Sequence, residues 1–243
     1  MLEAAAWGFL ASSSLLLGGV LALKLHPSRR AVGLVMAFGS GVLISAVAYE
    51  LVGEAAETAE LGRWVAAGLF AGCGVFFAGS VLIDRMGGAE RKDPDGGQAG
   101  GVALAIVLGI VLDGIPESIV IGLGLLTGAG VSVAVLTAVF LSNLPEAIAA
   151  STGLAKAGWR SSRIYGLWLL VAVVSALASL AGFALLDDAS TNTIGFVLAF
   201  AGGAILTMLA DTMMPEAFEH GGRVVGLLTT AGFGVAFLLH NLD

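Results

Sequence analysis

Two segments near the middle of the chain set oxygen-bearing side chains beside a proline inside a long apolar run. They are "VLDGIPESIVIG", residues 111–122, and "FLSNLPEAIAAS", residues 140–151. Their acid, amide and hydroxyl side chains belong to Asp113, Glu117, Ser142, Asn143 and Glu146. Oxygens of these kinds are hard ligands that suit divalent cations such as Mn²⁺, Mg²⁺ and Ca²⁺. The residue types therefore predict cation coordination.

The spacing of these residues favours one shared site. Asp113 and Glu117 are four residues apart, and so are Ser142 and Glu146, so each pair lies on one face of its helix. Two helices that face each other would bring both pairs together. We therefore expect the five side chains to converge.

The two prolines add further oxygen ligands. Pro116 has no N–H to bond back to Leu112, and Pro145 has none for Leu141. Each proline therefore frees a carbonyl one turn below its glutamate. We expect both helices to be kinked at these points, with loose carbonyls close to the carboxylates.

The elements that carry these segments are predicted to cross a membrane. Of 243 residues, 58% are hydrophobic and only 12% are charged, with a mean hydropathy of +0.98. A soluble domain of this size cannot bury so much apolar surface. A spanning helix needs about 20 apolar residues, and eight stretches qualify: about 5–25, 31–53, 64–85, 101–126, 131–153, 163–186, 192–215 and 223–240. We predict one all-α polytopic integral membrane domain over 1–243, with a cytoplasmic linker at 86–100.

The candidate ligands lie near the middle of their spans. Asp113 is twelve residues into its span and Glu146 fifteen into the next, at a rise of about 1.5 Å per residue. A carboxylate at that depth costs at least about 2.5–3.5 kcal/mol. The sequence places no lysine or arginine there, so we exclude a salt bridge. Protonation, a water-filled cavity or a bound cation remain, and the purely structural alternative is two kinked helices whose protonated acids bond to each other.

The charge distribution predicts the orientation of the spans. With the N-terminus outside, the cytoplasmic loops and helix ends carry ten of the eleven Lys and Arg residues, and only Arg63 is outside. The ten are Lys24, Arg29, Arg30, Arg85, Arg91, Lys92, Lys156, Arg160, Arg163 and Arg223. This bias follows the positive-inside rule. We expect a multi-pass protein of the inner or plasma membrane with both termini outside.

The chain also contains internal similarity. An offset of 162 residues aligns residues 38–55 with 200–217, and an offset of 29 aligns Pro116-Glu117 with Pro145-Glu146. In the predicted topology, spans 2 and 7 run in opposite directions, and so do spans 4 and 5. Inverted repeats around interrupted helices are typical of secondary transporters, whose site lies near the bilayer midplane.

Polar residues at the ends of spans 2 and 7 form a second set. We interpret them as entrance and exit positions for a cation, with interfacial side chains as the alternative. They are Glu50, Glu54, Asp211, Glu216, Glu219 and His220. The GxxxG pair Gly68 and Gly72 predicts close helix packing.

These features resemble the ZIP (Zrt/Irt-like) family of divalent-metal transporters. "DGIPES" (113–118) looks like the family's span-4 HNxPEG, and "SNLPEA" (142–147) looks like its span-5 H(N/D)xPEG. "ELVGEA" (50–55) and "TMMPEA" (212–217) resemble family segments in spans 2 and 7. The likeness covers essentially the whole chain. It implies a metal bound by Asp113, Glu117, Asn143 and Glu146.

The chain departs from the family at its histidines. Asp113 and Ser142 replace both motif histidines, and Gly114 replaces the motif asparagine of span 4. Residues 164–186 contain no acid to complete a second metal site, as span 6 does in some members. The resemblance implies zinc, whereas oxygen ligands favour Mn²⁺ or another harder ion, with Fe²⁺ compatible. We expect a divergent bacterial-type member with one oxygen site, whose metal is the substrate and not a cofactor.

The expected function is transport of a divalent cation by alternating access, not an enzymatic reaction. One alternative is a non-transporting relative that acts as a sensor or scaffold. Another is an intramembrane aspartyl protease using Asp113 and Asp211, although its GxGD motif is absent. A channel, or a carrier for another solute, is a third. We expect the lipid bilayer as surroundings, no nucleic-acid partner, and a homodimer as a compatible assembly.

Overall fold

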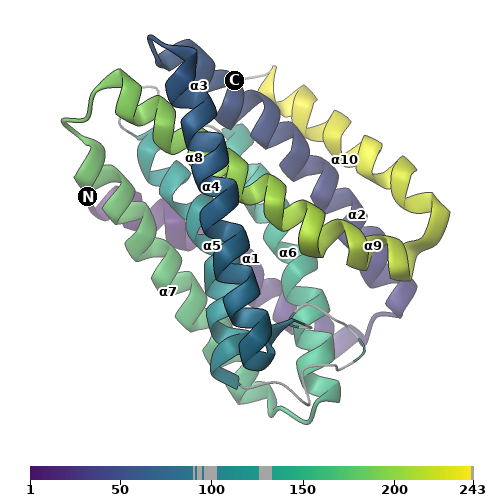
Figure 1. Cartoon of the computed structure of the whole chain (residues 1–243). Coiled ribbons are helices and arrows are strands. Elements are labelled where there is room, and N and C mark those ends of the chain that lie inside the picture. The colour runs from purple at the N-terminus through teal and green to yellow at the C-terminus, as the bar shows by residue number, and fades with distance from the viewer. Residues whose placement is uncertain (90, 92–94, 96–102, 126–132, 242–243) are drawn as a thin grey trace.

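The computed structural model describes residues 1–89, 91, 95, 103–125 and 133–241, and these residues form helices and turns with no strand (Figure 1). Within these described residues, seven continuous helical stretches are long and apolar enough to cross a membrane. The predicted all-α class is thereby confirmed for these residues, and the long apolar helices are those of a multi-pass membrane protein by length and composition. The last stretch, Thr191–His240, contains both of the last two predicted spans. The chain reverses within it near Gly222, where φ is 68°, and the count of eight spans stays a prediction.

The helices follow the predicted apolar stretches closely. Their bounds are α1 Leu2–Leu25, α2 Arg29–Ala46, α3 Glu54–Thr58, α4 Gly62–Ile83, α5 Ala103–Gly124, α6 Val133–Lys156, α7 Ser161–Leu186, α8 Thr191–Met208, α9 Met214–Gly221 and α10 Val225–His240. Wider π-helical turns cover Val47–Gly53, Asp84–Gly88 and Leu209–Met213, and a 3₁₀ turn covers Gly222–Val224. Lys92 and most of the predicted linker 86–100 lie outside the described residues.

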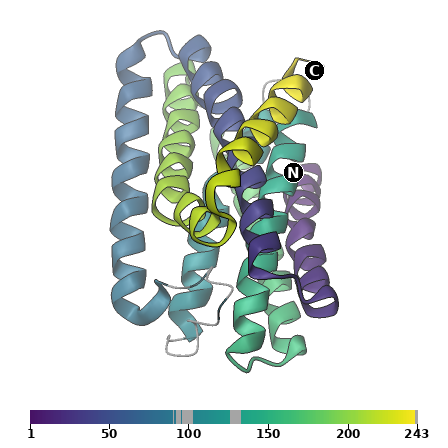
Figure 2. The same cartoon turned by 90° about the vertical axis from the view of Figure 1, so that its right-hand side faces the viewer.

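The helices pack in two groups. In one group α1 packs on α6 and α7, and α7 packs on α5; in the other α4 packs on α8, and α10 packs on α2 (Figure 2). The groups meet where α2 contacts α6 and where α8 contacts α5. Exchanging α1 with α7, α2 with α8, α4 with α10 and α5 with α6 leaves this set of contacts unchanged. The α1–α7 pair is converted into itself, and every other pair is converted into another pair of the set.

Helices α2 and α8 have matching beginnings and ends. Each has 18 residues, and each begins after a serine, Ser28 or Ser190, whose Oγ accepts a hydrogen bond from the backbone N–H three residues later. Such N-caps satisfy one of the helix's unpaired donors. Each helix then continues into a π-helical segment, at Val47 or at Leu209. Both pairs of positions are related by the offset of 162 residues that aligns the two sequences.

Glycines bring the helices of the second group into close contact. A Cβ at Gly41 would overlap the Thr229 carbonyl of α10, and a Cβ at Gly203 would overlap the Leu69 carbonyl of α4. Gly68 and Gly72 of α4 likewise leave no room for a side chain against α8. The predicted packing role of this GxxxG pair is confirmed, because only glycine lets the two backbones approach so closely.

Two of the basic helix ends that were predicted to share one side, at Arg29 and Lys156, lie close together. Asp95 of the linker forms ion pairs with Arg29 at the start of α2 and with Lys156 at the end of α6. In Figure 2 the α6–α7 connection lies at the lower end of the molecule and both termini lie in its upper half. The described linker residue Asp95 is therefore attached to two spanning helices.

Candidate cation site

The five predicted ligands all lie inside the helix bundle. Asp113 and Glu117 are on α5, and Ser142, Asn143 and Glu146 are on α6. All five are buried, with at most 8% of each residue exposed. Their helices are held between α1 and α7 on one side and α2 and α8 on the other, which removes these polar groups from the lipid-facing surface.

Both prolines lie within the helices, as their spacing predicted. α5 and α6 are continuous through Pro116 and Pro145, and the predicted kinks stay a prediction. The Pro145 ring packs where α2 carries Gly39, and a Cβ there would come within 2.8 Å of the ring. One turn before Pro145, Ser142 Oγ donates to the Val139 carbonyl at 3.0 Å, which leaves its lone pairs available as a ligand.

The Asp113 carboxylate forms a salt bridge with an arginine, Arg91. Arg91 Nε donates to Asp113 Oδ2 at 3.1 Å, and an Nη donates to Oδ1 at 3.2 Å. Both side chains are only 1% exposed. This is the two-point geometry in which a guanidinium binds a carboxylate most strongly. The expectation that no salt bridge reaches the buried acids was therefore wrong.

The error came from placing Arg91 in the linker, outside the bundle. Gly87, with φ 93°, turns the chain at the end of the α4 stretch, in a conformation that glycine adopts without strain. Gly88 then lies against the Ala105 backbone of α5. Gly109, one turn before Asp113, leaves the space for the Arg91 stem, because a Cβ at 109 would collide with Arg91 Cδ. The side chain thus runs along α5 to the carboxylate.

Several acids surround this guanidinium. Arg91 Nη1 lies 3.6 Å from Asp84 Oδ1 and donates to the Gly88 carbonyl at 3.4 Å. Burial by itself lowers the pKa of Arg91, but Asp113, with contributions from Asp84 and Glu146, raises the pKa above its ordinary value. The Glu146 carboxylate of α6 thus contributes to the raised pKa of Arg91. The guanidinium stays ionised among carboxylates contributed by three helical segments.

A second polar pair lies at the cavity that Glu117 lines. His240 Nδ1 lies 2.6 Å from Glu50 Oε1, and the His240 ring stacks on Tyr49 with centroids 5.4 Å apart. Glu50 and Glu117 line the same cavity of about 20 Å³, which is room for about one water molecule. The predicted entrance residue Glu50 and the predicted ligand Glu117 therefore face a common space.

The remaining entrance and exit candidates differ in their surroundings. Glu54 begins α3 and is half-buried, whereas Asp211 and Glu219 are exposed. Glu216 Oε2 lies 3.2 Å from His220 Nε2, one helical turn away in α9. The structure brings Glu50 toward the ligand set and leaves these four acids at helix ends.

The two predicted ligands of α5 have different neighbours. Asp113 contacts Arg91, whereas Glu117 lines the cavity with Glu50. Within the described parts of the chain, no three His, Cys, Asp or Glu side chains stand close enough to hold a metal ion. Buried carboxylate, amide and hydroxyl oxygens do fit a hard cation, but both oxygens of Asp113 already accept hydrogen bonds from Arg91.

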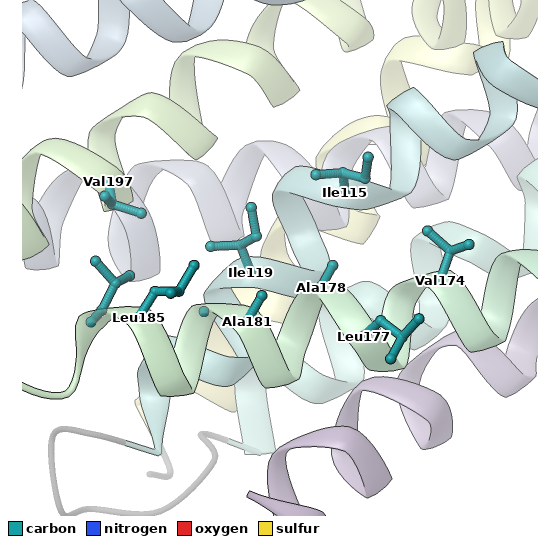
Figure 3. Close-up of a pocket in the computed structure, with 10 residues that line it drawn as sticks. Ile115, Ile119, Val174, Leu177, Ala178, Ala181, Leu185 and Val197 are labelled. Carbon is teal, nitrogen blue, oxygen red and sulfur yellow. The ribbon is translucent and has the colours of Figure 1, made fainter.

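A larger pocket lies where the two helix groups meet, between α5, α7 and α8 (Figure 3). It has a volume of about 530 Å³ and is lined by Ile115, Ile119, Val174, Leu177, Ala178, Ala181, Gly182, Leu185, Leu186 and Val197. These side chains offer only hydrocarbon. The pocket therefore cannot coordinate a cation and is separate from the candidate site.

Sequence reasoning missed two residues of the site, Arg91 and His240. One signal for Arg91 was Gly109, which leaves a gap on the helix face that also carries Asp113. No local pattern in the sequence links His240 to Glu50, 190 residues earlier. Only the packing of α10 on α2 brings them together.

The fold and the buried polar residues define the class as a multi-pass helical membrane protein with ionisable groups inside its bundle. Comparison with known proteins adds no narrower assignment. No protein-family model matches the chain, and no curated protein is significantly similar to it.

Proposed function

We propose that this protein is a ZIP-like transporter that moves a divalent cation across a cell membrane by alternating access. The proposal rests on the resemblance of the two Pro-Glu motifs and on one structural observation. Polar residues follow one another through an otherwise apolar bundle: His240 pairs with Glu50, Glu50 and Glu117 share a cavity, and Asp113, one turn from Glu117, binds Arg91.

Placing such a series of polar residues inside a membrane costs free energy, so its presence points to a function. Ionisable residues within spanning helices are rare and mark ion pathways when they face the bundle interior. In the predicted topology, His240 lies at the outer end and Arg91 enters from the cytoplasmic side. The series then extends across the membrane, with the predicted ligands at its centre.

The arrangement of helices supports the proposed alternating access. The pairwise exchange, which swaps helices within each of the two groups, and the matching ends of α2 and α8 are what inverted repeats would produce. One group, α1 with α5, α6 and α7, carries all the predicted ligands. In the proposed mechanism this group moves against the other and exposes the site to each side in turn.

The proposed cation is a hard divalent ion. The family resemblance favours zinc, whereas carboxylate, amide and hydroxyl oxygens favour Mn²⁺, with Fe²⁺ compatible. Asp113, Glu117, Ser142, Asn143 and Glu146 supply oxygens only. We accordingly expect Mn²⁺ to be accepted at least as well as Zn²⁺. The protein would act in the inner or plasma membrane with both termini outside.

One observation favours a second candidate function, a non-transporting relative that acts as a sensor or scaffold. A buried arginine on Asp113 supplies the charge that a metal would otherwise supply. The protease alternative has less support, because a catalytic aspartate pair shares a proton between two carboxylates. Asp113 is paired with Arg91 instead, and Asp211 is exposed.

The experiment is metal binding by the purified protein, measured by equilibrium dialysis and elemental analysis. We expect about one equivalent of bound Mn²⁺ per chain, and loss of binding in Glu117→Gln and Glu146→Gln. Glu57→Gln is the matched control, because Glu57 is an exposed acid on α3. The proposal fails if the folded wild-type protein binds no divalent cation, or if both site variants bind as the control does.

A further inference from the structure

The Arg91 guanidinium lies where carboxylates of three helical segments act on a single positive charge. Asp84 comes from the turn that ends α4, Asp113 from α5 and Glu146 from α6. A backbone carbonyl, at Gly88, completes this oxygen-rich environment. These are the surroundings that a bound cation would require. The guanidinium is thus a cation supplied by the chain itself.

Resting on the proposed transport of a divalent cation, we propose that Arg91 is a tethered competitor for the site and thereby determines its charge specificity. It neutralises Asp113 while the site is empty, and an incoming cation gains that ligand only by displacing it. A divalent ion has the higher charge needed to replace a two-point guanidinium pair, whereas Na⁺ or K⁺ does not.

The position of Arg91 allows such displacement. Arg91 is in a turn between the π-helical segment Asp84–Gly88 and α5, so it belongs to no spanning helix. Its backbone N–H donates to Gly88 O at 3.3 Å, a local contact. The side chain can therefore leave Asp113 without unfolding a transmembrane segment. If the positive charge served only to stabilise Asp113, an arginine on a neighbouring spanning helix would do so equally well.

The space at Gly109 provides a way to remove the competitor without removing its charge. The Arg91 stem fits only because residue 109 has no Cβ. Gly109→Ala should therefore displace Arg91 while keeping every acid of the site. Gly166→Ala in α7 is the matched control, because a Cβ at 166 would meet nothing within 4 Å. Arg91→Gln removes the charge directly and serves as the independent second variant.

The test measures Mn²⁺ binding to the full-length protein by titration calorimetry. If the site is competent in at most about 10% of molecules while Arg91 is bound, Gly109→Ala and Arg91→Gln should bind Mn²⁺ about tenfold or more tightly. Gly166→Ala should match the wild type. Na⁺ should compete with Mn²⁺ in Arg91→Gln but not in the wild-type protein.

A second readout follows the arginine itself. Trypsin cleaves after an arginine only if the side chain enters its pocket, and Arg91 is buried. Mn²⁺ should therefore increase cleavage after Arg91, with the exposed Arg85 as internal reference. Wild-type uptake of Mn²⁺ with unchanged affinity in both variants and no added cleavage would overturn the role of Arg91 alone. A wild type that neither binds nor transports a divalent cation would overturn the proposed function as well.

Discussion

The guanidinium of Arg91 holds both carboxylate oxygens of Asp113, at 3.1 and 3.2 Å, inside a bundle of apolar helices. The pair joins the connection that follows α4 to the middle of α5. It changes how the buried acids should be understood, because one of them already has a countercharge. Two consequences follow, one for stability and one for cation binding.

Removing one partner of this pair should be more harmful than removing both. Asp113→Ala leaves a buried guanidinium without its main partner, and such changes cost about 3–5 kcal/mol. Asp113→Ala combined with Arg91→Leu removes the charge as well and should recover a large part of that loss. The measurement is the free energy of unfolding in detergent. Equal stability of the single variant and the wild type would show that the pair is absent in solution.

Close packing of α4 on α8 should depend on Gly72. A Cβ there would overlap the Phe200 carbonyl, which is backbone and cannot rotate away. Gly72→Ala should lower the free energy of unfolding by about 1–3 kcal/mol, as overpacking does. Gly74→Ala, on the same helix with nothing within 4 Å, should have little effect. If the two variants lost the same stability, the α4–α8 contact would not be as close as described.

The Glu50–His240 pair should matter for cation capture at the proposed outer end. Glu50→Gln removes a carboxyl group that shares a cavity with Glu117 and leaves a neutral amide in its place. We expect a higher half-saturating concentration of Mn²⁺ in uptake, with a maximal rate close to that of the wild type. His240→Asn should act in the same direction. His26→Asn is the control, because asparagine tolerates the left-handed conformation of His26 at the end of α1; a larger effect there would argue against this role.

Acidic pH should weaken cation binding. Carboxylates bind a metal only when deprotonated, so binding releases protons and the apparent affinity rises with pH until the acids are ionised. The pKa of Arg91 is raised above its ordinary value, so the guanidinium stays charged throughout this range. The pH dependence of the affinity therefore reflects protonation of the carboxylates and not of Arg91. Mn²⁺ titrations between about pH 5 and pH 8 check it, and an affinity independent of pH would contradict carboxylate ligation.

Local sequence patterns were sufficient for the helices but not for the partners of the buried acids. Apolar stretches about 20 residues long predict spanning helices, since only they hide the backbone polar groups in lipid. The burial of Asp113 and Glu146 follows from their depth in such stretches. Position along the chain also assigned Arg91 to a solvent-exposed linker, because the sequence does not show the path that the linker takes in space. That path depends on Gly87, Gly88 and Gly109, which act through tertiary contacts.

Similarity within the chain was visible in the sequence, but its structural basis was not. The offset of 162 residues relates Ser28 to Ser190 as N-caps and Val47 to Leu209 as the first residues of π-helical segments. Serine is a common N-cap, so the first pair could be anticipated. The π-helical segments could not, because such turns are rare and no residue pattern in the sequence marks them.

Uptake of ⁵⁴Mn²⁺ into proteoliposomes that contain the purified protein tests the central claim most directly. The proposed function predicts saturable uptake by the wild-type protein, loss of uptake in Glu146→Gln, and wild-type uptake in the exposed-acid control Glu57→Gln. Uptake by the wild-type protein no faster than by protein-free liposomes, for Mn²⁺ and for Zn²⁺ and Fe²⁺ in parallel, would contradict it.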